Sequence, residues 1–315
     1  FIGHSSCSKL QILSLVEKNG MALDADLQDR KTQLSEFVEI TKSVLNYLPA
    51  VLTSYNDKGD YRIHLSEQAG VKKFIRPINQ RFFISNTTDF EAVFTNFSEL
   101  LSRIRKGERT FNEDELLTID QTLYTIQQSI GAGLDLLVNP NSARKHVGNR
   151  FEELIKVIFT EIGISNKKTV LQIPYDTDEG TKVYKCENDL ILSPFDSVKS
   201  TNESLDKDEI VVSVKTTSKD RMGKMFIDKI LLERFVKHDQ KVIGIFLNDV
   251  QRKEEDNISY TLVSGLFMVY SNFLTELEGV YYLDPPPNAK KEPYSKYMKS
   301  FSELITSDVW RLLTS

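Results

Sequence analysis

The chain has 315 residues, of which 40% are hydrophobic and 27% charged, and its formal net charge is −5. A chain of this length can bury one large core or two smaller ones, and the composition excludes a disordered or fibrous protein. Its two cysteines exclude a disulfide framework, and no apolar stretch is long enough to cross a bilayer, so we expect a cytoplasmic protein without membrane contact.

The first 140 residues are predicted to form a mainly helical N-terminal domain. Apolar residues recur with helical spacing over residues 27–48, 90–104 and 113–137. Residues 72–84 form an extended stretch that is rich in basic and aromatic side chains. This stretch fits either contact with a phosphate backbone or an edge strand that carries cations.

The run Asn139-Pro140-Asn141-Ser142 is typical of a turn and predicts a domain boundary at residue 140. Residues 141–315 then alternate between helical and strand-like segments. We expect helices near residues 150–162, 220–237 and 301–313, and strands at residues 169–173, 183–192, 210–214, 242–246 and 260–263. The pattern predicts an α/β domain with a mixed central sheet flanked by helices.

Lys215 is the residue that packing explains least. Four of the five residues 210–214 are apolar and β-branched, which predicts a buried strand, yet this strand ends in a lysine that polar residues follow. Asp189 stands 26 residues earlier, at the start of another apolar run. A carboxylate and a lysine at the ends of adjacent strands can hold a divalent cation, neutralise developing charge and orient water. The pair suggests a metal-dependent nuclease centre, in which Asp189 binds the metal and Lys215 serves the water and the phosphate.

Two more carboxylates could complete this centre. Glu152 lies on the flank of the apolar stripe of the helix at residues 150–162, whereas Glu153 is expected to point toward solvent. Asp228 follows Lys215 by 13 residues, so the next helix could bring its carboxylate back to the strand end. Each also has an ordinary interpretation, since Glu152 suits the start of a helix and Asp228 suits a solvated helix face.

The distribution of charge favours this region as a contact for nucleic acid. A net charge of −5 argues against such a partner, but residues 211–241 carry eight basic and four acidic side chains. For the basic residues in the outer part of the segment, a solvated helix face is the simpler explanation.

These residues resemble the PD-(D/E)XK nucleases. The run Gly148 to Glu152, then Asp189, then the run Ser213 to Arg221 are similar to the EcoRII and CCGG-type branch of type II restriction endonucleases. The most specific element is Lys-Thr-Thr-x-Lys-Asp-Arg, and the resemblance covers residues 142–247. The usual acid two residues before the lysine is replaced by Ser213, which is itself a mark of this branch.

In that branch the following helix supplies the missing acid. The acid is commonly glutamate at the position that Asp228 occupies here, so the shorter carboxylate is a departure, and Glu233 could take its place. The resemblance implies that Asp189, Glu152 and Asp228 hold Mg²⁺ while Lys215 acts on the water and the phosphate.

The resemblance also implies how bases are read. Lys219, Asp220 and Arg221 would enter the major groove of double-stranded DNA. Because Arg and Lys donate to guanine and Asp accepts from cytosine, we expect a short palindromic site that contains G·C pairs. The ordinary alternative is a helix start capped by Asp220 beside solvated cations.

A symmetric site that is cut in both strands favours a homodimer or a pair of dimers. The helical N-terminal domain would contribute to DNA contact or to dimerisation. Two other interpretations stay open: a sequence-specific DNA-binding protein whose nuclease chemistry has lapsed, which the short Asp228 permits, and a related nuclease that acts on branched or damaged DNA. The recognition sequence and the stagger of the cut do not follow from the sequence.

Overall fold

The computed structural model describes residues 20–68, 70–219, 221–262 and 264–314. The chain forms two compact units that interleave along the sequence. The first comprises Phe1–Phe94, Gln121–Glu153 and Gln251–Ser259, and the second comprises Thr95–Asp120, Leu154–Val250 and Tyr260–Ser315. Residue 140, the boundary expected from the sequence, is where helix α5 (Pro140–Glu161) begins, and α5 contributes residues to both units.

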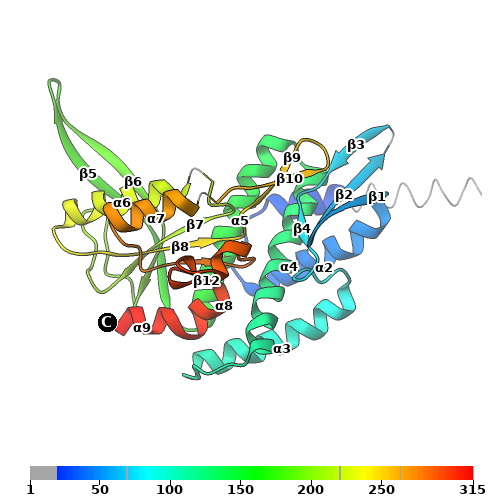
Figure 1. Ribbon diagram of the computed structural model, residues 1–315, viewed down its shortest axis with the longest axis horizontal. Helices are drawn as coiled ribbons and strands as arrows, with labels where there is room; N and C mark the ends of the chain where they lie inside the picture. Colours follow the sequence, from blue (N-terminus) through cyan, green and yellow to red (C-terminus); the bar gives the residue numbers. More distant parts are fainter. Residues whose placement is uncertain (1–19, 69, 220, 263, 315) are drawn as a thin grey trace, which may run out of the picture. The chain divides into compact units, whose positions relative to one another are not determined.

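The first unit is mainly helical and contains a small antiparallel sheet (Figure 1). Its helical segments are residues 20–28, α2 (Leu34–Val51), the start of α3 (Thr87–Arg105), most of α4 (Glu113–Leu137) and the first part of α5. Strand β2 (Tyr61–Gln68) pairs with β1 (Ser54–Lys58), β3 (Val71–Phe74) and β4 (Ile78–Asn79). Most of the two-stranded hairpin β9 (Val250–Lys253) and β10 (Asn257–Tyr260) also belongs to this unit.

Local hydrogen bonds explain where these elements start. The helix predicted at residues 27–48 is interrupted, and α2 begins at Leu34. The Glu36 carboxylate accepts the backbone N–H groups of Thr32 and Gln33 at 2.7 and 2.8 Å, which fixes the start of α2. These backbone hydrogen bonds also lower the pKa of Glu36.

Part of the basic stretch at residues 72–84 is used inside the unit. Arg76 forms a bidentate ion pair with Asp135 of α4, with distances of 2.9 and 2.8 Å. The guanidinium lies against Gly131, where a Cβ atom would come within 2.3 Å of it. The charge of Arg76 therefore stabilises the packing of this stretch on α4.

The second unit is built around a six-stranded mixed sheet with the order β12-β11-β8-β7-β6-β5. The strands are β5 (Ser165–Thr177), β6 (Gly180–Ser193), β7 (Ile210–Lys215), β8 (Lys241–Phe246), β11 (Gly279–Tyr282) and β12 (Met298–Ser300). β5, β6 and β7 pair antiparallel, whereas β7, β8, β11 and β12 pair parallel. The prediction of a mixed central sheet flanked by helices is confirmed.

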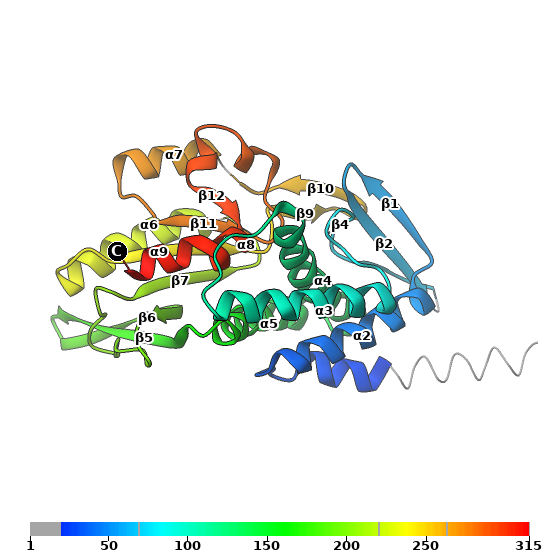
Figure 2. The ribbon, with the colours of Figure 1, turned by 90° about the horizontal axis from the view of Figure 1, so that it is seen from below.

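Helices α6 (Arg221–Val236) and α7 (Ser264–Phe273) lie side by side (Figures 1 and 2). Phe226 of α6 makes edge contacts with the rings of Phe267 and Tyr270 of α7. The chain closes with short turns at Pro287–Lys290 and Tyr294–Lys296, then α8 (Phe301–Glu303), a π-helical turn at Leu304–Asp308 and α9 (Val309–Thr314).

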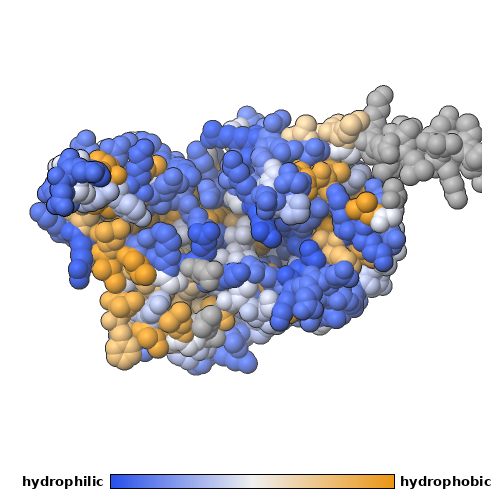
Figure 3. All heavy atoms as spheres, turned by 90° about the horizontal axis from the view of Figure 1, so that it is seen from above, coloured by the Kyte–Doolittle hydropathy of each residue, from blue (hydrophilic) through white to orange (hydrophobic). Residues whose placement is uncertain are grey.

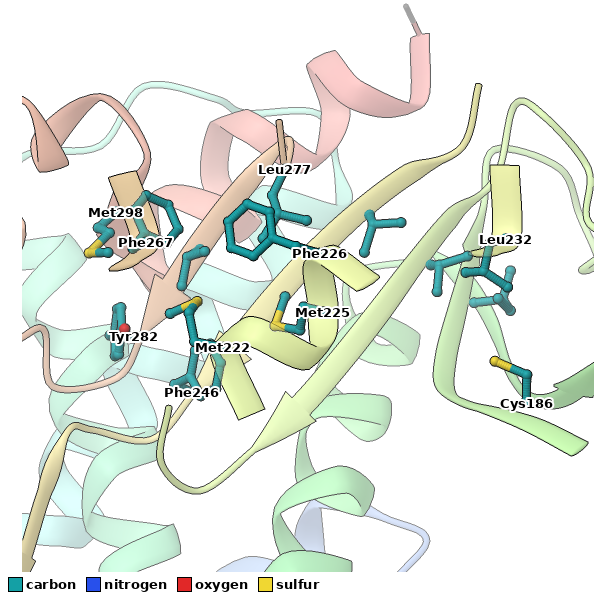
Figure 4. Packing of buried hydrophobic residues seen from close by; sticks show 14 of the residues in the cluster. Cys186, Met222, Met225, Phe226, Leu232, Phe246, Phe267, Leu277, Tyr282 and Met298 are labelled. Carbon is teal, nitrogen blue, oxygen red and sulfur yellow. The ribbon is translucent and has the colours of Figure 1, made fainter. Parts of the chain in front are cut away.

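α6 packs its apolar side on one face of the sheet, as Figure 4 shows. Met222, Met225 and Phe226 point from α6 into a cluster with Phe246 of β8 and Tyr282 of β11. The alternate residues of the strands are buried as well, so both faces of the central strands are covered. This arrangement fixes the strand ends, where the polar side chains of interest lie.

The hairpin of β5 and β6 extends beyond the rest of the sheet as an arm, visible at the upper left of Figure 1. β6 pairs with β7 only through residues 190–192, whereas its pairing with β5 continues from Asn188 to Gly180. Residues 169–188 are named here the β5–β6 arm. Both outer edges of the arm lack a strand partner among the described residues.

Some elements differ from the expectation. The strand predicted at residues 260–263 does not join the central sheet, because Tyr260 ends β10, which pairs with β9. β11, β12 and α7 were not predicted. In the described part of the chain, no helix combines the length and apolar character that a membrane span requires.

Candidate active site

Lys215 is the last residue of β7, which lies between β6 and β8 in the sheet. Because side chains alternate along a strand, Val211, Ser213 and Lys215 share one face, and Val211 packs in the cluster beneath α6. The Lys215 side chain is 28% exposed. The buried strand therefore carries the lysine out of the core at its carboxyl end.

Asp189 of β6 meets Lys215, as the sequence predicted. The Oδ2 atom of Asp189 accepts a hydrogen bond from Lys215 Nζ at 2.5 Å and another from the Val214 N–H at 2.9 Å. The Asp189 side chain is 11% exposed. A carboxylate and an ammonium group are thus held together at the edge of the sheet, and the backbone of β7 fixes the carboxylate in place.

A β-bulge in β6 accompanies this placement. Lys167 pairs with Ile191 and Thr169 with Asn188, so one residue of β5 faces two residues of β6, Asp189 and Leu190. In a regular strand, residues five apart point to opposite faces, yet Cys186 and Ile191 both pack in the cluster beneath α6. Bulges of this kind are common beside active sites, where they redirect a side chain.

Asp228 lies in the middle of α6. It forms an ion pair of 2.5 Å with Lys224, one helical turn earlier. Burial raises the pKa of the Cys186 thiol, and the charge of Asp228 raises it further while that of Lys224 opposes this. Cys186 precedes Asp189 by three residues on β6, so Asp228 faces the strand that carries Asp189.

Glu233, the alternative helix acid, lies at the other end of the sheet. Its Oε1 accepts the Gln240 N–H at 3.3 Å, immediately before β8 begins. Because β7 and β8 run parallel and Lys241 pairs with Ile210, this is the amino end of both strands. Glu233 is therefore separated from Lys215 by the length of β7.

The adjacent glutamates Glu152 and Glu153 of α5 differ from the expectation in one respect. Glu152 is half-buried on α5, as its flank position predicted. Glu153 does not point into solvent: its carboxylate accepts the Lys31 N–H at 2.9 Å and pairs with Arg150 at 2.7 Å. Arg150 is 3% exposed, so Glu153 compensates a buried charge that periodicity alone could not reveal.

The proposed base-reading residues lie between β7 and α6. Lys219 and Arg221 are both exposed, and Arg221 is the first residue of α6. Asp220 lies outside the described residues. The cations that follow Lys215 are therefore on the surface and within a few residues of the ion pair.

Asp249 is a buried residue of this region that the sequence analysis missed. It is 1% exposed, lies three residues beyond Phe246, the last residue of β8, and accepts the Ser218 N–H at 2.9 Å. A signal for it was present, because Asn248 and Asp249 come directly after an apolar run that ends at Leu247, just as Lys215 comes directly after the apolar Val214. Polar residues at the carboxyl ends of parallel neighbours are expected to converge.

The donor chemistry of the site is that of hard oxygen ligands. Both hydrogen bonds of Asp189 fall on Oδ2, and neither uses Oδ1. Over the residues with described positions, no three His, Cys, Asp or Glu side chains gather closely enough to hold a metal ion. The structure thus brings Asp189 and Lys215 together, while the complete ligand set remains a prediction.

A cavity lies elsewhere in the second unit. It has a volume of about 700 Å³ and is lined by residues that include Arg109, Phe195 and Trp310. The Arg109 guanidinium stacks 3.7 Å from the centre of the Trp310 ring. Ser193, which follows Leu192 opposite Ile210, also lines this cavity, so it lies toward the amino end of β7 and away from Lys215.

Comparison with known proteins supports the fold. No protein-family profile and no curated protein matches the sequence. Among solved structures, the chain is similar to the type IIP restriction endonuclease Kpn2I, with a TM-score of 0.65 and 14% sequence identity over 95% of this chain and 98% of that chain. A complex of the restriction endonuclease PspGI with substrate DNA also matches, with a TM-score of 0.39 and 14% identity over 71% of this chain and 92% of that chain. The likeness to Kpn2I establishes that this chain has a restriction endonuclease fold.

Proposed function

We propose that this protein is a type II restriction endonuclease that hydrolyses phosphodiester bonds in both strands of double-stranded DNA. The observation that carries the proposal is the contact between Asp189 and Lys215, 2.5 Å apart, where β7 ends beside the bulge of β6. It occurs in a chain whose fold is that of Kpn2I. Packing does not require an ion pair at the end of an apolar strand, whereas a carboxylate beside a lysine can hold a divalent cation, neutralise the charge that develops on the phosphate and orient water.

The side chains of the site have different chemical roles. Mg²⁺, when bound, would stabilise the charge that develops on the phosphate and favour deprotonation of water. Asp189 fits as a ligand, because Val214 and Lys215 hold one carboxylate oxygen and leave Oδ1 out of both hydrogen bonds. We assign Asp228 and Glu152 as further ligands. The Lys215 ammonium group can donate to a phosphate oxygen and orient the attacking water.

Lys219, Asp220 and Arg221 are assigned to the reading of bases. Lys219 and Arg221 are exposed and follow Lys215 by four and six residues, so one segment carries both the catalytic lysine and the cations. Lysine and arginine donate to the guanine edge in the major groove, and aspartate accepts from cytosine. We therefore propose a short palindromic site with G·C pairs.

A two-fold symmetric cut requires two copies of the site, and one surface fits a second copy of this chain. Exposed apolar side chains gather on α6, on α7 and at its end, and Figure 3 shows orange atoms on this side of the second unit. They are Ile227, Leu266, Val269, Phe273 and Leu274. We name these five residues the α6–α7 apolar surface. Exposed apolar patches of this kind mark sites of protein association.

Charge favours protein rather than DNA as the partner of this surface. The neighbouring β5–β6 arm has four acidic and two basic residues, and this excess of negative charge would repel the phosphate backbone of DNA. α6 exposes three basic residues, Arg221, Lys224 and Arg234, while Lys229 is buried and pairs with Glu278, so the arm of one copy is complementary in charge to α6 of another. We propose that the protein is a homodimer that associates through this surface.

Digestion of a plasmid of known sequence in Mg²⁺, followed by mapping of the ends, tests the proposed function. The expected result is a discrete set of fragments whose ends share one palindrome. Sequence-specific binding in Ca²⁺ with no cleavage under any divalent ion would instead indicate a DNA-binding protein whose chemistry has lapsed. Preference for branched or damaged DNA over the plasmid would indicate another kind of nuclease on this fold.

A further inference from the structure

The segment that connects Lys215 to α6 is short and buried at its centre. Thr216 and Thr217 are half-buried, and Ser218 is fully buried. The Ser218 carbonyl accepts the N–H groups of Arg221 and Met222 at 2.7 and 2.9 Å, so α6 starts from Ser218. The position of Ser218 therefore determines where the cations after Lys215 and the first turn of α6 lie.

Asp249 holds Ser218 from the neighbouring strand. Its Oδ1 atom accepts the Ser218 N–H at 2.9 Å and the Thr261 hydroxyl at 3.1 Å. Asp249 follows β8, and the backbone of this strand stays in register with β7, because Leu247 N–H donates to the Lys215 carbonyl at 3.3 Å. A hydrogen bond of a carboxylate to a backbone N–H is one of the stronger kinds in proteins.

The surroundings of Asp249 make it a costly residue for stability. Its carboxylate is buried together with the Ser218 and Tyr282 hydroxyl groups. Burial, the charge of Asp249 and a hydrogen bond with its carboxylate raise the pKa of Tyr282 well above its usual range, while a hydrogen bond with Ser218 opposes this. A carboxylate that is 1% exposed is costly to remove from water, which is more readily understood if the residue serves the site.

We propose that Asp249 is a positioning residue that fixes the β7–α6 turn, and through it the direction of Lys215 and of the base-reading side chains Lys219 and Arg221. The inference rests on the proposed function for its effect on DNA. Asp249 touches no reacting group and acts through the Ser218 N–H. Its loss should therefore lower the discrimination between DNA sites, and the accompanying loss of fold stability should not by itself account for that effect.

Asp120 provides a matched control within the second unit. It is 5% exposed and accepts the N–H and the hydroxyl of Ser302 at 2.9 and 2.7 Å. Like Asp249, it is a buried aspartate bound to one backbone N–H and one hydroxyl; because burial raises the pKa of Asp120 to about 8, the variants are compared above that pH, where its carboxylate is charged. Ser302 belongs to α8, so Asp120→Ala removes the same kind of contact without touching the turn after Lys215.

The test compares Asp249→Ala, Asp249→Asn and Asp120→Ala. Cleavage rates are measured on duplexes with the mapped site and with one base pair changed. Removal of a hydrogen bond to a charged group is expected to lower the ratio of these rates by about tenfold or more in Asp249→Ala. Asp249→Asn keeps an oxygen that can accept the Ser218 N–H, so it should retain most of the discrimination. Asp120→Ala should keep the cleavage-rate ratio of the unaltered protein, even if its unfolding midpoint falls as far as that of Asp249→Ala.

Amide hydrogen exchange separates this inference from the proposed function. In the absence of DNA, Asp249→Ala should accelerate exchange in a peptide that covers residues 216–222, while Asp249→Asn and Asp120→Ala leave that peptide close to the unaltered protein. If the unaltered protein cuts no DNA, the proposed function fails and exchange alone decides whether Asp249 fixes the turn. Unchanged exchange in Asp249→Ala, or equal loss of discrimination in Asp120→Ala, would overturn the inference.

Discussion

Replacement of Lys215 by alanine should abolish cleavage while it leaves the fold largely intact. The side chain forms an ion pair with Asp189, in which the lysine is 28% and the aspartate 11% exposed. In Lys215→Ala the Asp189 carboxylate keeps the hydrogen bond from the Val214 N–H at 2.9 Å. The carboxylate therefore stays oriented, and the change removes only the cation.

The expected magnitudes follow from this geometry. Loss of one partner of a fully buried ion pair costs roughly 3–5 kcal/mol, and an exposed pair contributes roughly 0–1 kcal/mol. The partly exposed pair of Lys215 lies between these limits, at about 1–2 kcal/mol after allowance for solvent screening. Loss of a donor that stabilises transition-state charge lowers the rate by about 10²–10³-fold. Activity should thus fall far more than stability.

The assay is single-turnover cleavage of plasmid DNA in Mg²⁺, combined with unfolding in urea. Lys299→Ala is the matched control, because Lys299 pairs with Asp308 at 2.7 Å with exposures of 33% and 8%. Both variants should lose similar stability, and only Lys215→Ala should lose cleavage. If Lys215→Ala cleaves as fast as Lys299→Ala at equal fraction folded, the assignment of Lys215 is wrong.

Three further predictions concern the helix acid, the dimer and pH. Asp228→Asn should lower the cleavage rate by about 10–100-fold at limiting Mg²⁺. Glu233 accepts the Gln240 N–H instead, so the cleavage rate of Glu233→Gln should depend on Mg²⁺ concentration as that of the unaltered protein does. Phe273, which is 81% exposed on the α6–α7 apolar surface, should be needed for association: Phe273→Asp should sediment as a monomer, while Leu117→Asp, at a site 41% exposed, should sediment as a dimer. Burial raises the pKa of Asp120 to about 8, although hydrogen bonds from Ser302 lower it. Because the folded-state pKa exceeds the unfolded value of about 4, unfolding free energy should fall as pH rises from about 4 to about 8. Urea unfolding across this range should show a flatter profile for Asp120→Asn, and an equal slope in both proteins would contradict the assignment.

The sequence predicted the central part of the sheet and the ion pair for physical reasons. β7 is a run of β-branched residues long enough to identify, and an ammonium group at its end stands out because burial of a charge is costly. The 26 residues between Asp189 and Lys215 are compatible with neighbouring strands, and the structure shows those strands paired. Local pattern and tertiary packing agree in this region.

Other features could not be read from local pattern. β11 has four residues and β12 has three, which is too short for a periodic signal. α5 begins ten residues before its predicted start, although Pro140 at the first helical position and the Asn139 side chain, which accepts the Ser142 N–H at 3.0 Å, mark its beginning. The bulge at Asp189 and the contact of Asp249 with Ser218 depend on which strands become neighbours. Such contacts are long-range and leave no spacing in the sequence.

The bulge in β6 sets the phase between the β5–β6 arm and the sheet. Paired residues of an antiparallel ladder point to the same face, so Cys186, paired with Leu171, shares the face of Ile191, paired with Lys167, only because the bulge at 189–190 takes up one extra residue. If the same sequence continued through 186–191 without the bulge, Cys186 would point away from the cluster beneath α6, and every side chain from Gly180 to Asn188 would change faces with it. The residue that presents a carboxylate to Lys215 is therefore one of the two that set which face of the arm lies against this cluster.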